Sequence, residues 1–194
     1  MKLDIRAQEA RVPHTTTAAG EISAAVFRRT LGRFVSGVTI VTAVDPCDGQ
    51  AHGMTASAFL SVSLDPPLAL VSLDHRGAML EVTGRAERFG VSILQEHQDP
   101  LAFHFGGRPD PDVQVEVCSR AGVPVLAQSL AYLVMRVSDL HRAGDHSLLL
   151  GEIEELGCLD DGAPLAYFAG RFFRLAVSAE EAELVPVGPD PVWM

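Results

Sequence analysis

The sequence predicts a mostly β protein, an antiparallel β-barrel with short helices, on three observations. Seven segments are rich in the β-branched and apolar residues that are typical of strands. Clusters of Gly, Pro and Asp separate these segments, as at Asp45-Pro46, Asp65-Pro66-Pro67 and Asp160-Asp161-Gly162. The chain shows no regular alternation of strands with helices of about 12 residues, which a parallel doubly wound sheet needs.

A helix is expected before the first strand. Ser23 is its expected N-cap, and Gly37 is expected to cap its C-terminus. Apolar residues recur between them at three- and four-residue steps, namely Phe27, Leu31, Phe34 and Val35. This spacing predicts one apolar face.

The seven candidate strands fill most of the remaining chain. They are expected at Val38–Val44, Phe59–Leu64, Leu68–Leu73, Arg88–Leu94, Leu130–Leu140, His146–Leu156 and Leu165–Leu175. Two short helices are expected between them, one near Ala78–Val82 and one that begins at Asp99-Pro100, where proline suits the first helical position. Seven strands are enough to form a barrel.

The length of 194 residues and the hydrophobic content of 47% suit one domain. We expect an N-terminal arm over residues 1–22, a single β-rich domain over residues 23–177, and a proline-containing tail over residues 178–194.

Charge and composition exclude several classes of partner. Fifteen Lys and Arg stand against 25 Asp and Glu, and a net charge of −10 argues against binding of nucleic acid. No apolar run approaches the roughly 20 residues of a membrane span, and Met1–Gly20 lacks a signal-peptide core, so we expect a cytoplasmic protein without a membrane partner. Cys47, Cys118 and Cys158 form no Cys-x-x-Cys pair, which predicts buried free thiols.

The stretch from Gly53 to Pro67 has an unusual residue pattern. Small hydroxyl residues alternate there with apolar ones before a double proline. A flavin needs such a wall, with hydroxyls along its ribityl chain, backbone groups near its pyrimidine edge and apolar contacts under its ring. Composition alone favours the alternative, an edge strand with a solvated Ser/Thr face.

A second candidate binding motif is Gly144-Asp145-His146. It predicts a turn followed by a histidine at the start of an apolar strand. An imidazole with a pKa of about 6.5 can hydrogen-bond a ligand or carry positive charge near physiological pH. Taken alone, the motif also fits a turn histidine that Asp145 holds in place.

Other motifs are missing from the sequence. The histidine pairs His141/His146 and His97/His104 have no carboxylate at ligand spacing, so we expect no metal site. No Gly-x-Ser-x-Gly supports a hydrolase, and no Gly-x-Gly-x-x-Gly supports a Rossmann unit.

Four motifs in order give a resemblance to a known family. They are Phe27-x-x-x-Leu31-Gly32-x-Phe34-x-x-Gly37-Val38-Thr39-Ile40-Val41-Thr42, the Gly53–Pro67 block, Gly144-Asp145-His146, and Pro164-Leu165-x-Tyr167-x-x-Gly170-x-Phe172. The chain resembles the flavin reductase-like, FMN-binding split-barrel family over about residues 24–175. The resemblance implies an antiparallel Greek-key split barrel and a homodimer that uses NADH or NADPH to reduce FMN or FAD. It also implies a partner, a flavin-dependent monooxygenase.

The same resemblance implies where the flavin would bind. The isoalloxazine and ribityl wall corresponds to a strand over Gly53–Val62, whose contacts would be Thr55, Ala56, Ser57 and Ser61, followed by Ser63. The loop that closes over the site corresponds to Phe105-Gly106-Gly107-Arg108, and Ser92 stands where relatives often carry Asn.

The flavin phosphate would lie near His75, Arg76 and Met79. Relatives commonly carry Ser or Thr at the position of Met79, and a thioether cannot donate a hydrogen bond. Phosphate binding would then depend on Arg76, on His75 or on backbone N–H groups at the start of the short helix.

The resemblance assigns His146 to nicotinamide binding as the catalytic-site histidine. The implied reaction is hydride transfer from the nicotinamide C4 to the flavin N5, chemistry that the two small molecules themselves supply. A flavin-binding electron-transfer or sensor protein of the same fold, without nicotinamide turnover, remains the alternative.

Overall fold

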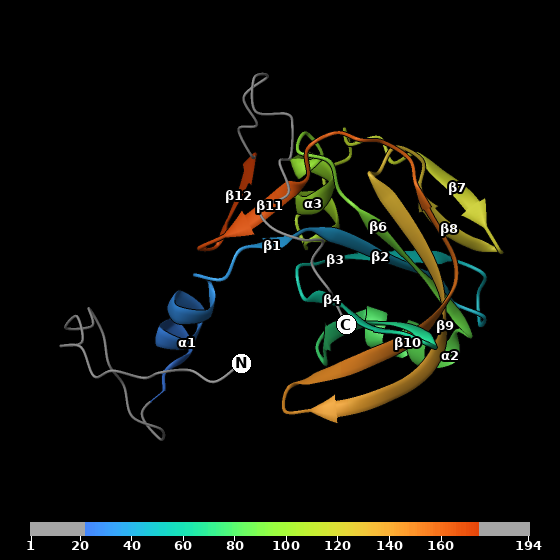
Figure 1. Cartoon of the computed structure of the whole chain (residues 1–194), viewed down its shortest axis with the longest axis horizontal. Coiled ribbons are helices and arrows are strands. Elements are labelled where there is room, and N and C mark those ends of the chain that lie inside the picture. The colour runs from blue at the N-terminus through green and yellow to red at the C-terminus, as the bar shows by residue number, and fades with distance from the viewer. Residues whose placement is uncertain (1–21, 175–194) are drawn as a thin grey trace.

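The structure is a computed structural model that describes residues 22–174. Its main sheet has seven strands, and every neighbouring pair is antiparallel. In spatial order they are β3 (Ala51–Ala56), β2 (Thr39–Val44), β6 (Arg88–Ile93), β9 (Ala131–Ala143), β10 (His146–Cys158), β5 (Pro67–Asp74) and β4 (Phe59–Leu64). The sheet curls into a barrel, with β9 and β10 extending as a long hairpin beyond it (Figure 1).

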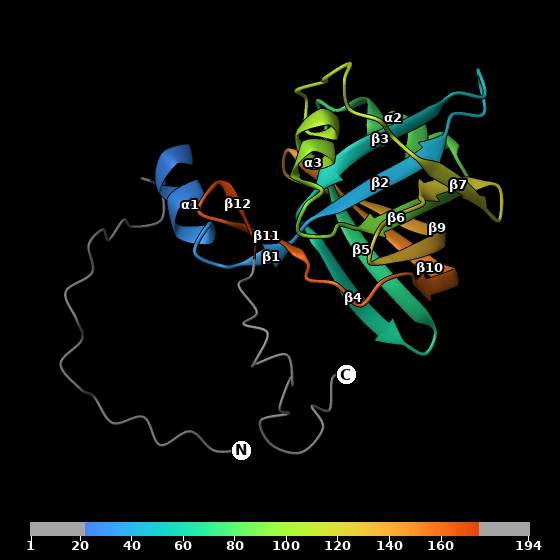
Figure 2. The same cartoon turned by 90° about the horizontal axis from the view of Figure 1, so that it is seen from above.

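Two smaller sheets accompany the barrel. One contains β1 (Ser36–Gly37), β11 (Leu165–Phe168) and β12 (Arg171–Arg174), and the other pairs β7 (Val117–Arg120) with β8 (Val123–Leu126). Figure 2 shows that the three-stranded sheet and helix α1 (Ala24–Leu31) project together from one side of the barrel.

The hydrophobic core fills the curve of the main sheet. Helix α2 (Ala78–Arg85) packs Met79 and Val82 into it, against β2, β3 and β5. A second cluster lies between β2, β11 and helix α3 (Asp99–Phe105), with Ile40, Leu94 and Leu165 fully buried. The two helices thus cover the part of the barrel where β3 forms a sheet edge.

The mostly β, antiparallel fold class is confirmed, and both short helices lie where the sequence placed them. The segment Gly53–Val62, however, is not one strand. It breaks at Ser57-Ala58, because β3 pairs with β2 only as far as Ala56, and β4 then starts at Phe59 as the partner of β5. The two halves therefore lie at opposite edges of the seven-stranded sheet.

The first helix is shorter than the sequence predicts. It ends at Leu31 and Gly32 caps it by donating to the carbonyl of Arg28, so Gly37 as the C-cap is wrong. The backbone of Ser36 and Gly37 pairs instead with Tyr167 and Ala166 of β11. A competing sheet therefore ends the helix early.

The last expected strand is a hairpin. Residues Ala169 and Gly170 have φ values of +50° and +81°, and this left-handed turn separates β11 from β12. The pair β7 and β8 was not predicted, although a similar turn at Ala121-Gly122, with φ values of +45° and +81°, joins them.

Other sequence expectations have mixed outcomes. The thiols are not buried as expected: Cys47 and Cys158 are exposed and Cys118 is partly buried. Within residues 22–174, no helix has the length and hydropathy that crossing a membrane requires. Apart from Ile22, the expected arm over residues 1–22 lies outside the described residues, as does the expected tail over residues 178–194.

Candidate functional site

Two cavities meet beside the edge strand β3. The larger, of about 660 Å³, is lined by Val38, Thr55, Ser57, Asp99, Ala102, Phe103, Gly106, Arg108, Tyr167, Gly170, Arg171 and Phe172. The smaller, of about 300 Å³, is lined by His52, Gly53, Met54, Thr55, Asp74, Gly77, Ala78, Met79, Phe105 and Gly106. Thr55 and Gly106 line both, so the two cavities adjoin and together have the size of a small-molecule site.

The wall between the cavities is built by β3 and α3. The Thr55 hydroxyl donates a hydrogen bond to the carbonyl oxygen of Ala102 at 2.7 Å, which ties the strand to the helix. Gly53 allows the ring of Phe105 to lie against β3, because a Cβ there would come within 2.7 Å of the Phe105 Cε1. A glycine and a helix end thus place an aromatic ring in the smaller cavity.

The smaller cavity contains the N-terminus of α2. Gly77 is the N-cap, and no side chain caps the helix. The first residues of α2, Ala78 and Met79, line the cavity. Uncapped N–H groups and the positive end of the helix dipole favour a phosphate or carboxylate at this position.

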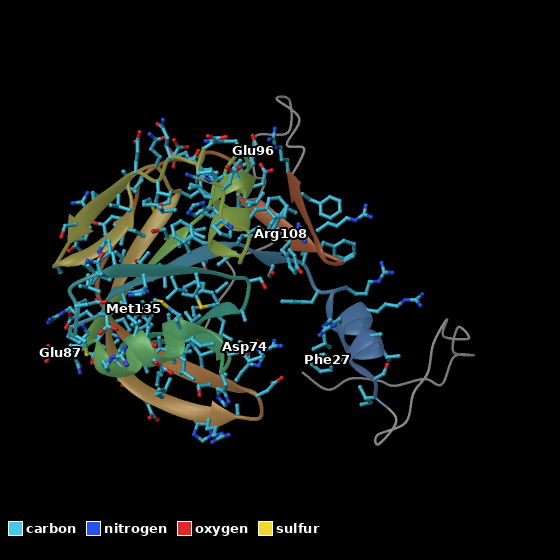
Figure 3. All side chains as sticks on the ribbon, turned by 180° about the vertical axis from the view of Figure 1, so that it is seen from behind. Phe27, Asp74, Glu87, Glu96, Arg108 and Met135 are labelled. Atoms are coloured by element: carbon cyan, nitrogen blue, oxygen red, sulfur yellow. The ribbon has the colours of Figure 1, made fainter. Side chains whose placement is uncertain are left out.

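The charges of the neighbouring loop are already paired. Arg76 donates to both carboxylate oxygens of Asp74, at 3.1 Å from Nε to each and 2.5 Å from Nη2 to Oδ2. This hydrogen bonding holds the pKa of Asp74 well below its usual range and raises that of Arg76. Figure 3 shows Asp74 on the side of the barrel from which α1 projects.

Hydrogen bonds join this loop to the β9–β10 hairpin. The His75 Nε2 lies 3.0 Å from the Ser147 Oγ, and the His75 N–H donates to the carbonyl of Asp145 at 3.1 Å. His146 begins β10 directly opposite Asp74 in the β5 register. Its Nδ1 lies 2.7 Å from the Asp145 Oδ1, and this hydrogen bond lowers the pKa of Asp145.

The structure brings together some of the sequence-predicted flavin residues. Thr55 and Ser57 line the larger cavity, while Met79 and Phe105 line the smaller one. His146 lies near the smaller cavity through its pairing with Asp74, and its side chain is 41% exposed.

Other predicted residues are not among those that line the two cavities. Ser61 and Ser63 lie on β4, which begins after the break that follows Ala56. Ser92 is fully buried and accepts a hydrogen bond from the Leu126 N–H, so its hydroxyl reaches neither cavity.

Four predicted positions have side chains that are buried or hydrogen-bonded within the protein. Ala56 is buried, and its carbonyl accepts from the Thr39 hydroxyl. The guanidinium of Arg76 is directed to Asp74, and the ring of His75 to Ser147. Met79 is only 4% exposed and belongs to the core, so its backbone N–H is the part available to a phosphate.

The sequence did not identify Asp99, Phe103 and Arg171 as cavity residues, and it placed Arg108 only in the loop expected to close over the site. Arg108 and Arg171 belong to the segments Phe105-Gly106-Gly107-Arg108 and Tyr167-x-x-Gly-x-Phe172, which were noted as motifs. The charged residue in each motif was the signal that could have identified them.

One group of described residues has the composition of a metal site. Ligand atoms of Asp45, Asp48 and His52 come within 4.8 Å of one another at the β2–β3 hairpin. The Arg85 guanidinium already pairs with Asp45 and holds the pKa of that carboxyl at about 2. The expectation of no metal stays a prediction.

A curled antiparallel sheet with adjoining cavities at one edge defines a split-barrel protein with a nucleotide-sized site. Residues 31–176 match the family model described as "Flavin reductase like domain". The chain belongs to the flavin reductase-like family.

Two characterised relatives show the range of similarity. The chain is 44% identical over 166 residues to an NADH-dependent flavin reductase of a Rhodococcus species, covering 82% of this chain and 93% of the relative. It is 38% identical over 149 residues to the reductase component of 4-hydroxyphenylacetate 3-monooxygenase of Thermus thermophilus, covering 77% of this chain and 95% of the relative.

Solved structures have the same fold. The NADH:FAD oxidoreductase SgcE6 of Streptomyces globisporus aligns with a TM-score of 0.75 and 30% identity, over 89% of this chain and 98% of that one. The styrene monooxygenase flavin reductase of Pseudomonas putida S12 aligns with a TM-score of 0.72 and 32% identity, over 78% and 98%.

Proposed function

We propose that this protein is an NADH-dependent flavin reductase that reduces FMN or FAD and supplies the reduced flavin to a flavin-dependent monooxygenase. The observation that carries the proposal is the pair of adjoining cavities, one at an uncapped helix N-terminus and one with aromatic walls. Relatives named as NADH-dependent flavin reductases and as monooxygenase reductase components support it.

The residues present fit a flavin. The N–H groups at the start of α2 would hold the phosphate, and Thr55 and Ser57 would border the ribityl chain and the ring. Because the Thr55 proton is donated to Ala102, this hydroxyl would meet the flavin as an acceptor. Phe105 would supply apolar contact.

When both small molecules are bound, they supply the hydride chemistry between nicotinamide C4 and flavin N5. The protein would hold the two rings within reach of each other. His146 would hydrogen-bond the nicotinamide nucleotide or place positive charge near it, oriented through its Nδ1 contact with Asp145. No side chain needs to act as a nucleophile.

The proposed assembly is a twofold symmetric homodimer. Helix α1 has no buried residue, and its large apolar side chains Phe27 and Leu31 are each more than half exposed. Phe34, just after α1, is 81% exposed, and Leu64 at the other sheet edge is 80% exposed. Apolar surface of this extent marks an interaction site.

The proposed location is the cytoplasm. The three cysteines are free, which suits a reducing compartment.

The test is steady-state oxidation of NADH and NADPH with FMN, FAD and riboflavin as acceptors. We expect turnover with NADH and at least one flavin, and production of free reduced flavin that a separate monooxygenase can use. An electron-transfer or sensor protein of this fold would bind flavin without catalysing NADH oxidation, and that result would reject the proposal.

A further inference from the structure

The larger cavity has a wall that the flavin assignment leaves unused. Arg108 follows α3, and Arg171 with Phe172 belongs to β12, across from Tyr167 of β11. We call these four residues the arginine wall. Figure 3 shows Arg108 on the same side of the barrel as Asp74.

The arginine wall carries positive charge that the described residues do not neutralise. Neither Arg108 nor Arg171 forms an ion pair within residues 22–174, and the carboxylate of the cavity, Asp99, lies 3.6 Å from Arg174 instead. Other arginines of the described residues do pair with carboxylates, as Arg85 does with Asp45 and Arg88 with Glu154. Two cations that line a cavity and have no carboxylate partner among residues 22–174, in a chain of net charge −10, favour an anionic ligand.

The same wall offers flat apolar surface. The rings of Tyr167 and Phe172 lie 5.5 Å apart between centroids, and that of Phe103 lies 4.9 Å from Phe172. The Arg108 guanidinium carbon lies 5.7 Å from the Phe103 ring centroid. Aromatic rings beside guanidinium groups bind ligands that combine a planar ring with phosphate.

We propose that the arginine wall binds the adenosine diphosphate group that NADH and FAD have in common. The inference rests on the proposed function and extends it, because Thr55 and Ser57 are assigned to the flavin, whereas the arginine wall lines the same cavity and has no role in that assignment. A cavity of about 660 Å³ has room for more than one planar ring system.

A direct titration of the full chain with ADP tests the binding chemistry without any turnover. We expect ADP to bind, Arg108→Ala and Arg171→Ala each to weaken it about tenfold, and affinity to fall as NaCl is added. Arg108→Lys keeps the charge and is expected to recover part of the loss. Arg136→Ala, which removes a cation that pairs with Glu152 and Glu154 away from the cavities, is the control and leaves ADP affinity unchanged.

Steady-state kinetics then distinguishes the two sources of the group. If the wall holds the ADP group of NADH, Arg171→Ala raises the KM for NADH about tenfold and leaves that for reduced nicotinamide mononucleotide unchanged. If it holds the ADP group of FAD, the variant raises the KM for FAD and leaves that for FMN unchanged. Either pattern supports the proposal.

Two results would overturn it. One is ADP binding that is undetectable or equally strong in wild type, Arg108→Ala and Arg171→Ala. The other is an equal rise in KM for the mononucleotide and dinucleotide substrates, which would mean that the arginines contact the reacting rings. In both cases FMN reduction persists, whereas failure of the proposed function would remove NADH oxidation with every flavin.

Discussion

The Thr55 hydroxyl and the Ala102 carbonyl form a 2.7 Å hydrogen bond at the point where the two cavities meet. A second threonine, Thr39, makes the same kind of bond at 2.9 Å to the carbonyl of Ala56 but lines neither cavity. Loss of the Thr39 hydrogen bond therefore reports the structural effect alone, whereas loss of the Thr55 bond reports the structural effect together with any effect on ligand binding.

We expect Thr55→Val and Thr39→Val each to lower the free energy of unfolding by about 0.5–1.5 kcal/mol, because each leaves a carbonyl without its partner. Urea denaturation measures this loss. Only Thr55→Val should raise the KM for flavin, since only Thr55 borders the site. An equal rise in both variants would show that the effect comes from a general disturbance of β3.

His146→Ala is expected to raise the KM for NADH about tenfold, or about 1.4 kcal/mol, with flavin affinity little changed. The matched control is His141→Ala, because His141 is exposed on the opposite arm of the same hairpin. Kinetics at saturating flavin provide the measurement. If KM and kcat stay at wild-type values, His146 is a turn residue held by Asp145.

Gly77 provides a test of the phosphate position. Its φ of −87° suits any L-residue, and a Cβ would lie 3.4 Å from the Asp74 carbonyl oxygen. Ser and Asp are both good N-caps, so both variants should stabilise α2 by a few tenths of a kcal/mol. Only Gly77→Asp adds a negative charge at the proposed phosphate site.

We therefore expect Gly77→Asp to weaken FMN about tenfold and riboflavin little, and Gly77→Ser to weaken FMN less than Gly77→Asp because its cap carries no negative charge. Fluorescence titration of the two flavins measures the contrast. Equal losses for FMN and riboflavin in Gly77→Asp would place the phosphate elsewhere. A substitution at Met79 is a poorer test, because Met79 is buried in the core and its replacement by serine would also create a cavity.

The ion pair of Asp45 and Arg85 gives a pH dependence. Hydrogen bonding from Arg85 lowers the pKa of Asp45 from 3.8 to about 2 in the folded protein. A depressed folded-state pKa contributes stability above the unfolded-state value, which is lost as the pH falls through the folded-state value. Asp45→Asn should therefore lower the melting temperature at pH 7.

The difference between Asp45→Asn and wild type should shrink as the pH falls from 3.8 toward about 2, where wild-type Asp45 also becomes protonated. Asp161→Asn, at an exposed loop carboxyl, is the control. Thermal unfolding followed across this range gives the result. A difference in melting temperature that stays constant with pH would show that the substitution does not act through the charge of Asp45.

The exposed apolar residues of the α1 region predict a dimer. Phe34→Asp should yield a monomer at micromolar concentration, whereas Val117→Asp, at a 53% exposed residue on β7, should leave the dimer intact. Light scattering measures the mass. A wild-type monomer would contradict the proposed assembly.

Local patterns predicted most of the fold. Strand segments such as Arg88–Leu94 and the Asp99-Pro100 helix start are encoded within a few residues, and they were found. The errors occur where distant pairing decides the outcome. Gly37 joins β1 because Ala166 lies beside it, and the chain breaks after Ala56 because β4 pairs with β5.

The site was predicted less completely for the same reason. Thr55, Phe105 and Ser61 were all assigned through the family resemblance. Thr55 and Phe105 line the cavities, whereas Ser61 was assigned as part of one continuous strand and lies on β4 after a break. Ser92 lies on an interior strand, and its hydroxyl oxygen accepts a hydrogen bond from the Leu126 N–H. Arg171 becomes a cavity residue only through the β11–β12 turn, which a linear pattern did not reveal.

Anaerobic mixing of a trace of the protein with NADH and excess FMN tests the proposed reductase function most directly. We expect the visible absorption of FMN to bleach through many equivalents per protein chain, because the reduced flavin leaves the site and is replaced. Reduction that stops at one equivalent, or that does not exceed the rate without protein, would contradict a reductase that supplies free reduced flavin.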